Sequence, residues 1–207
     1  MPNFTDLTGL ASVASAIAVC LLPFSGIARL TKSYLAMLLG AVFVLALIPF
    51  ATMPLAAYVR GVTGDLSITT LVLLWCALLK PWCSSIKCNN RFALLILIAF
   101  AALALYPMAL GIGAYDPYRL GYGDPLFIAA LLLLALLAWL RRFSIIALCI
   151  AFATLSWAVG WYESDNLWDY LLDPFVSIYA LAVIMIHAVK MLLQRGRSHP
   201  SQPFSPG

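Results

Sequence analysis

Charged side chains are scarce in this sequence, and their scarcity excludes most classes of protein. Only 10% of the 207 residues are Asp, Glu, Lys or Arg, whereas 64% are hydrophobic. Soluble domains carry about 25% charged residues, and a chain of this length cannot bury so much apolar surface inside a water-soluble shell. The mean hydropathy of +1.01 agrees with this. Composition therefore excludes a soluble globular protein, a disordered chain and a disulfide-rich scaffold.

Familiar catalytic and ligand-binding motifs are also absent from the sequence. It contains no nucleophile elbow, no phosphate-binding glycine loop, no paired zinc histidines and no dinucleotide fingerprint. Cys83 and Cys88 have the spacing of half a zinc site, but no second pair of ligands completes it. Basic residues are too sparse for a nucleic-acid interface. We therefore expect no metal, no cofactor and no nucleic-acid partner.

Long apolar runs dominate the sequence instead. A membrane-spanning helix needs about 20 mostly apolar residues, whereas strands of a membrane barrel are short and alternating. We predict an all-α, polytopic bundle over residues 1–195, followed by a flexible cytoplasmic tail over 196–207. Pro49, Pro54 and Pro107 are expected to kink the second and fourth spans. The seven predicted spans lie near residues 7–28, 33–59, 66–82, 92–115, 125–140, 143–162 and 174–193.

The signs of the few charges predict the orientation of these spans. Seven spans place ten of the twelve basic residues in one set of loops and all eight acidic residues in the other. Short loops rich in Lys and Arg remain cytoplasmic, so the N-terminus is expected outside and the C-terminus inside. Short loops without a glycosylated ectodomain favour a bacterial inner membrane, where the basic face would meet anionic lipid headgroups.

Two of the predicted outer loops, residues 115–125 and 161–174, carry most of the polar chemistry. Asp124 and Asp173 each precede a proline and an apolar run, which is the pattern of a helix N-cap. Residues Asn166 to Leu172 are expected to form a short interfacial helix. The residues that capping does not explain form a candidate periplasmic functional face, together with two of the interleaved aromatic rings: Asp116, Tyr118, Arg119, Glu163, Asp165, Trp168 and Asp169.

Several chemistries fit this face. Aromatic rings beside carboxylates suit a sugar or a lipid headgroup, and two carboxylates can share acid and base work in glycosyl chemistry. Arg119 could clamp a phosphate or pair with an acid and pin the loops together. Asp165 and Asp169, one helical turn apart, repel each other unless a cation or a basic partner lies between them.

Three functions follow from these features. The first is an accessory or scaffold subunit for another membrane or periplasmic protein, because the spans lack the intramembrane charges that ion-driven carriers need. The second is an outer-leaflet enzyme that modifies a lipid or glycan through the loop carboxylates, although we favour a non-enzymatic role. The third is a carrier for a neutral or lipid-like solute, built on the proline-containing spans.

Overall fold

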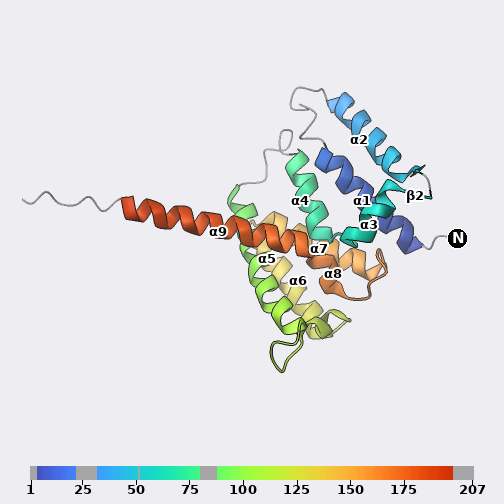
Figure 1. Ribbon diagram of the computed structural model, residues 1–207. Helices are drawn as coiled ribbons and strands as arrows, with labels where there is room; N and C mark the ends of the chain where they lie inside the picture. The colour runs from blue at the N-terminus through green and yellow to red at the C-terminus, as the bar shows by residue number, and fades with distance from the viewer. Residues whose placement is uncertain (1–3, 22–31, 51, 80–87, 198–207) are drawn as a thin grey trace, which may run out of the picture.

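The structure, a computed structural model, describes residues 4–21, 32–50, 52–79 and 88–197 (Figure 1). Its regular elements are helices, apart from one pair of two-residue strands. The predicted all-α fold is therefore confirmed. Cys83 and the tail from residue 198 onward lie outside the described residues, while the helix that precedes this tail extends to Arg197.

The described residues between 4 and 79 form four helices and the strand pair. Helix α1 packs against both α2 and α3, and it also contacts α4. The short strands pair in antiparallel register, with Pro49 opposite Pro54. In chain order, these elements are α1 (Phe4–Leu21), α2 (Lys32–Leu47), β1 (Pro49–Phe50), β2 (Met53–Pro54), α3 (Leu55–Thr63) and α4 (Ile68–Leu79).

The second predicted span is not one kinked helix. Helix α2 ends at Leu47, the chain reverses through β1 and β2, and α3 then begins at Leu55. Proline has no backbone N–H and clashes with the preceding helical turn, and it disfavours helical backbone in the residue before it. Pro49 and Pro54 therefore end one helix and precede another, whereas Pro107 remains inside α5.

Residues 88–197 add five α-helices and one 3₁₀ helix. Helix α6 packs mainly on α7, and α5 packs on α9 and on α7. Helix α9 extends well beyond the other described helices (Figure 1). These elements are α5 (Cys88–Ala109), η3 (Pro117–Gly121), α6 (Pro125–Leu140), α7 (Ser144–Ala158), α8 (Leu167–Leu171) and α9 (Pro174–Arg197).

Three described helices are long and apolar enough to cross a membrane, at Phe4–Leu21, Asn90–Ala109 and Pro174–Gln194. These features indicate a membrane protein. The apolar helices α2, α4, α6 and α7 have 16, 12, 16 and 15 residues. At 1.5 Å per residue, a helix of 16 residues is about 24 Å long, which is shorter than a hydrocarbon core of about 30 Å.

Buried side chains form two clusters. The smaller one holds Val13 and Ala14 of α1 against Ala46 of α2 and Ala56 of α3. The larger one runs through the helices from α4 to α9 and includes the fully buried Tyr170 and Leu167 of α8. The predicted short helix is thus present, and its apolar face is inserted into the core.

Candidate functional site

The two predicted outer loops lie side by side in the structure. The Tyr118 hydroxyl donates to both carboxylate oxygens of Asp169, at 2.9 and 3.0 Å. The Asn166 amide donates to the Tyr118 carbonyl at 2.9 Å, and the Trp168 indole donates to the Pro117 carbonyl at 3.1 Å. These bonds join η3 to α8, two elements about fifty residues apart in the chain. Three of the seven predicted site residues make these contacts, and a fourth, Arg119, is next to one of them in the chain. The three are Tyr118, Trp168 and Asp169.

The close approach of η3 and α8 depends on Gly121, which is buried. A Cβ atom at this position would lie 2.7 Å from Cγ of Asn166 and 2.8 Å from Cδ1 of Trp168. Real Cβ atoms do not tolerate such distances, and the Asn166 side chain is buried and held by hydrogen bonds to the Tyr118 carbonyl and the Trp168 amide. A glycine is therefore required for the two loops to meet in this way.

Asp169 is fully engaged within the chain. Besides Tyr118, it accepts a hydrogen bond from the hydroxyl of Ser164. Partial burial raises the pKa of the Tyr118 phenol well above its ordinary value, and its bond to the Asp169 carboxylate raises that pKa further. The phenol thus remains a donor at neutral pH. The sequence predicts that Asp165 and Asp169 repel each other. The hydroxyls of Tyr118 and Ser164 stabilise the negative charge of Asp169 and so reduce the cost of this repulsion.

Both predicted N-caps are present. Asp124 accepts from two backbone amides of the first turn of α6, at 2.9 and 3.0 Å. Asp173 accepts from the amide of Val176 in α9 at 2.8 Å. An Asp in this position satisfies amides that have no partner within the helix and places a negative charge at the positive end of the helix dipole.

Asp116 also serves as a cap, contrary to the prediction from the sequence. Its carboxylate accepts from the backbone amide of Tyr118 at 2.9 Å, at the start of η3. In the sequence, an Asp in front of a long apolar run predicts a cap, and the five-residue η3 is too short to produce such a run.

A second polar cluster surrounds Arg60, which is not among the site residues predicted from the sequence. The guanidinium binds Asp65 through two nitrogens, at 2.6 and 2.9 Å. It also contacts Asp6 at 3.3 Å and Glu163 at 3.7 Å. Hydrogen bonding to Asp65, assisted by the other carboxylates, raises the pKa of Arg60. One cation therefore holds the starts of α1 and α4 and the loop before α8 together.

The sequence contained a signal for this cluster. Arg60 is one of only two basic residues in the predicted outer loops, so its pairing with the surrounding acids could have been foreseen. The chosen cation, Arg119, is exposed and forms no ion pair with any described residue. The expected ion pair between Arg119 and an acid of the two loops is therefore absent among the described residues.

Trp161 attaches the N-terminal helix to the same loop. Thr8 of α1 donates to the Trp161 carbonyl, and the Trp161 indole donates to Ser12 at 3.3 Å. In the neighbouring segment, the Trp157 indole donates to the backbone carbonyl of Asp165 at 2.8 Å, while the Asp165 residue remains exposed. The loop from 159 to 173 is thus fixed by contacts from several elements.

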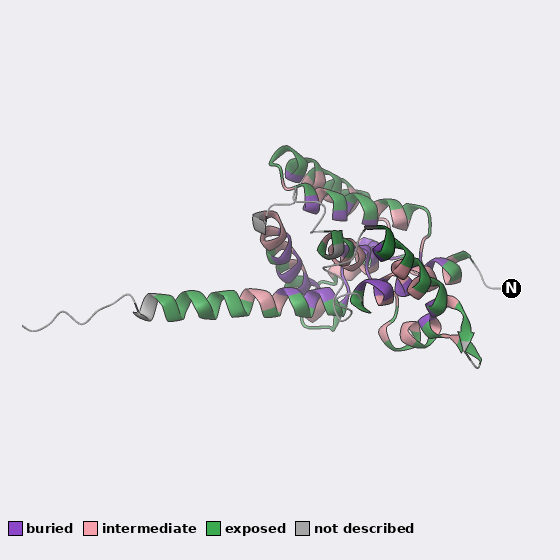
Figure 2. Cartoon of the chain, turned by 90° about the horizontal axis from the view of Figure 1, so that it is seen from above, coloured by how far each residue is buried: buried purple, intermediate pink, exposed green. Residues whose placement is uncertain are grey.

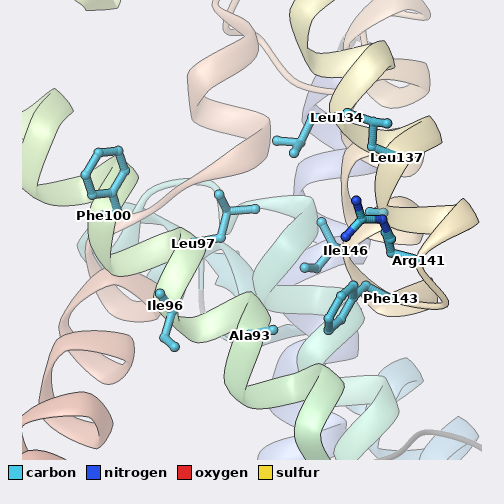
Figure 3. Close-up of a pocket in the computed structure, with 10 residues that line it drawn as sticks. Ala93, Ile96, Leu97, Phe100, Leu134, Leu137, Arg141, Phe143 and Ile146 are labelled. Carbon is cyan, nitrogen blue, oxygen red and sulfur yellow. The ribbon is translucent and has the colours of Figure 1, made fainter.

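Two apolar cavities lie between α5 and the α6–α7 pair. The first has a volume of about 560 Å³ and extends from Phe100 and Leu134 to Phe143 and Arg141 (Figure 3). The second has a volume of about 300 Å³ and reaches Trp168 of α8 at the other end. Neither cavity has a carboxylate among its lining residues. Over the part of the chain that the structure describes, no cluster of three His, Cys, Asp or Glu side chains could hold a metal ion.

Comparison with known proteins assigns no relative: no family model, no curated protein and no solved structure matches this chain.

Proposed function

We propose that the chain crosses a bacterial inner membrane seven times, with its N-terminus outside. The support is the segregation of charge along the bundle. Ion pairs and hydrogen bonds gather the acidic loops at one end, around Arg60 and Tyr118. At the opposite end, Asn90 donates to the Arg142 carbonyl at 2.8 Å, and Arg91 donates to the Cys76 carbonyl at 2.6 Å. Basic loops of this kind remain cytoplasmic.

Reporter fusions test this orientation. Alkaline phosphatase, which is active only outside the inner membrane, should be active when fused after Tyr122 and inactive when fused after Arg142. A fluorescent protein that folds only in the cytoplasm should give the reverse result at the same two positions. The same activity at both positions would contradict the orientation.

Within this membrane, the chain is an accessory or scaffold subunit for another envelope protein. The observation that carries the proposal is the second half of α9. Every residue from Met185 to Gln194 is exposed, and the helix projects past the others (Figure 2). This stretch is mostly apolar, and its polar side chains, His187, Lys190 and Gln194, recur at helical spacing on one side. The other side of the stretch is an exposed apolar face, which a helix of a partner protein would cover.

The outer loops support a structural role as well. Asp116, Glu163 and Asp169 each make a bond within the chain that orders a loop or joins two elements. A catalytic pair of carboxylates needs access to a substrate, and these three would first have to leave their partners. The outer-leaflet enzyme therefore has less support than the subunit.

Site-specific photocrosslinking distinguishes a protein partner from lipid. A photoreactive amino acid at Ile186 of α9 should yield one protein adduct of defined mass in native membranes. The matched control is Leu136 of α6, whose exposure of 48% is close to the 55% of Ile186. Leu136 should give lipid adducts only. Lipid adducts alone at both positions, with no stoichiometric protein after purification in mild detergent, would contradict the proposal.

The apolar cavities favour a carrier for a lipid-like solute as a second candidate. Their linings are hydrophobic, and they lie between helices rather than in a water-filled loop region. Transfer of a fluorescent lipid between leaflets of reconstituted vesicles would separate the two roles. A scaffold leaves the transfer rate at the level of protein-free vesicles, whereas a carrier increases it.

A further inference from the structure

The two cavities are parts of one groove. They share Leu97 and Phe100 of α5 and Leu134 of α6. Helix α7 closes the groove from behind, because both α5 and α6 pack on it. The groove therefore follows α6 from its end at Arg141 to the region of Pro117 and Trp168.

The length and lining of this groove suit a hydrocarbon chain. The lining residues on the α6 side of the groove run from Leu131 to Arg141, a length of about 15 Å along a helix, and one leaflet of the hydrocarbon core is also about 15 Å thick. The lining between the two ends is mostly aliphatic and aromatic, with Thr69, Met108 and Cys149 as the other side chains. A chain that enters at the Arg141 end would thus remain in apolar contact over its whole length.

The Arg141 end of the groove is charged, unlike the apolar lining of the rest. Arg141 lines the cavity, and Figure 3 shows its guanidinium facing the space that Leu97 and Ile146 also face. Among the described residues, Arg141 has no acidic partner, and the described acids lie at the other end of the bundle. By contrast, Arg91 is bonded to a carbonyl of α4. Arg141 is therefore a cation at the mouth of an apolar groove.

We propose that this groove binds an anionic phospholipid, with one acyl chain between α5 and α6 and the phosphate on the Arg141 guanidinium. A guanidinium forms two parallel hydrogen bonds to a phosphate, which fixes the headgroup as well as attracting it. The headgroup lies at the level where the basic loops meet the lipid surface. The lipid site does not depend on the scaffold role, because lipid can fill the groove with or without a partner on α9.

Binding to the purified full-length chain tests the site by native mass spectrometry. The probe is phosphatidylglycerol, and diacylglycerol with the same acyl chains serves as the phosphate-free comparison. A charge-assisted bond corresponds to about a tenfold difference in affinity, so phosphatidylglycerol should bind about tenfold more tightly than diacylglycerol. Glycerol phosphate, which lacks the chains, should not displace the lipid at equal concentration.

Two variants separate the phosphate contact from general surface charge. Arg141→Gln should lower phosphatidylglycerol affinity about tenfold and leave diacylglycerol binding unchanged. Arg142→Gln removes the same charge one residue away, at a side chain that does not line the groove, and should change affinity by less than about twofold. Leu134→Trp should fill the shared part of the groove and weaken both lipids.

Each possible result bears on the proposal. Equal losses for Arg141→Gln and Arg142→Gln would mean that only surface charge attracts the lipid. Equal affinity for both lipids in the unmodified protein would overturn the phosphate contact. Displacement by glycerol phosphate would overturn the acyl-chain site. If Leu134→Trp fails to fold, the comparison of Arg141→Gln with Arg142→Gln still tests the phosphate contact.

Discussion

The carboxylate of Asp173 binds Ser67, which lies 106 residues earlier in the chain. One of its oxygens accepts from the Ser67 amide at 2.9 Å and from the Ser67 hydroxyl at 2.8 Å. Its other oxygen caps α9 through Val176. Asp173 is only 4% exposed. One buried carboxylate therefore satisfies donors at the starts of both α4 and α9 and fixes the two helices at a common end.

Replacement of Asp173 by alanine should be more destabilising than replacement of Asp124. Asp173→Ala leaves the buried Ser67 amide without an acceptor and also removes a cap, so we expect a loss of about 3 kcal/mol in the free energy of unfolding. Asp124→Ala removes a more accessible cap and should cost about 1 kcal/mol. Unfolding in mixed micelles, followed by circular dichroism, measures both. Equal losses would show that the bond to Ser67 contributes nothing.

These two aspartates illustrate which features the sequence could predict. A cap is a local pattern, because an Asp in front of a proline and an apolar run acts on amides a few residues away. Both caps were therefore predicted correctly. The bond from Asp173 to Ser67 depends on how α4 and α9 pack, and no local pattern contains that information. The all-α fold was predictable for the same reason as the caps, since composition and run length determine it.

The candidate site was predictable only in part. The sequence predicts the two loops but not their pairing through Tyr118 and Asp169, and it favours Arg119 where Arg60 holds the acids together. The exposed Arg119 and the paired Arg60 differ in tertiary surroundings, not in residue type. The groove ending at Arg141 was also beyond prediction, because α5 and α6 must first be placed on α7.

Gly121→Ala should uncouple the two outer loops. The new methyl group would displace the Asn166 side chain, which donates to the Tyr118 carbonyl and accepts from the Trp168 amide. We expect a loss of about 2 kcal/mol, typical of overpacking in a buried contact. A double-mutant cycle with Asn166→Ala checks the cause. The glycine replacement should cost clearly less when Asn166 is already truncated, and additive losses would contradict this explanation.

Arg142→Gly should stabilise the protein. Helix α6 ends in a Schellman motif, in which the Phe143 amide donates to the Ala138 carbonyl and the Arg142 amide to the Trp139 carbonyl. Arg142 occupies the left-handed position with a φ of 64°, where α7 uses Gly160 with a φ of 63°. A non-glycine residue there costs about 1 kcal/mol, so the variant should gain roughly that amount.

The melting temperature of Arg142→Gly measures this gain, and Arg142→Ala provides the control. Alanine removes the charge but keeps the left-handed strain, so it should not raise the melting temperature. If alanine and glycine stabilise equally, the cause is the removal of charge beside Arg141 rather than relief of the backbone.

Glu163 should make the free energy of unfolding fall as the pH rises above the ordinary pKa of a glutamate. Its carboxyl shares a hydrogen bond with Asp6, which raises the pKa of Glu163 in the folded state despite the opposing effect of Arg60. The folded state therefore holds the proton more tightly than the unfolded state. Between the two pKa values it binds more protons, so this stabilisation is complete at low pH and is lost as the pH rises through the folded pKa.

Glu163→Gln tests this sign. The amide cannot ionise, yet it can still donate to Asp6, so the variant should lack the decrease that Glu163 contributes to wild-type stability as the pH rises above the ordinary pKa of a glutamate. Asp165→Asn, which changes an exposed acid of the same loop, should leave that decrease in place. Denaturant midpoints in mixed micelles at a series of pH values give the slopes. A slope in Glu163→Gln that equals the wild-type slope would mean that Asp6 and Glu163 do not share a proton, and that the cluster is held by Arg60 alone.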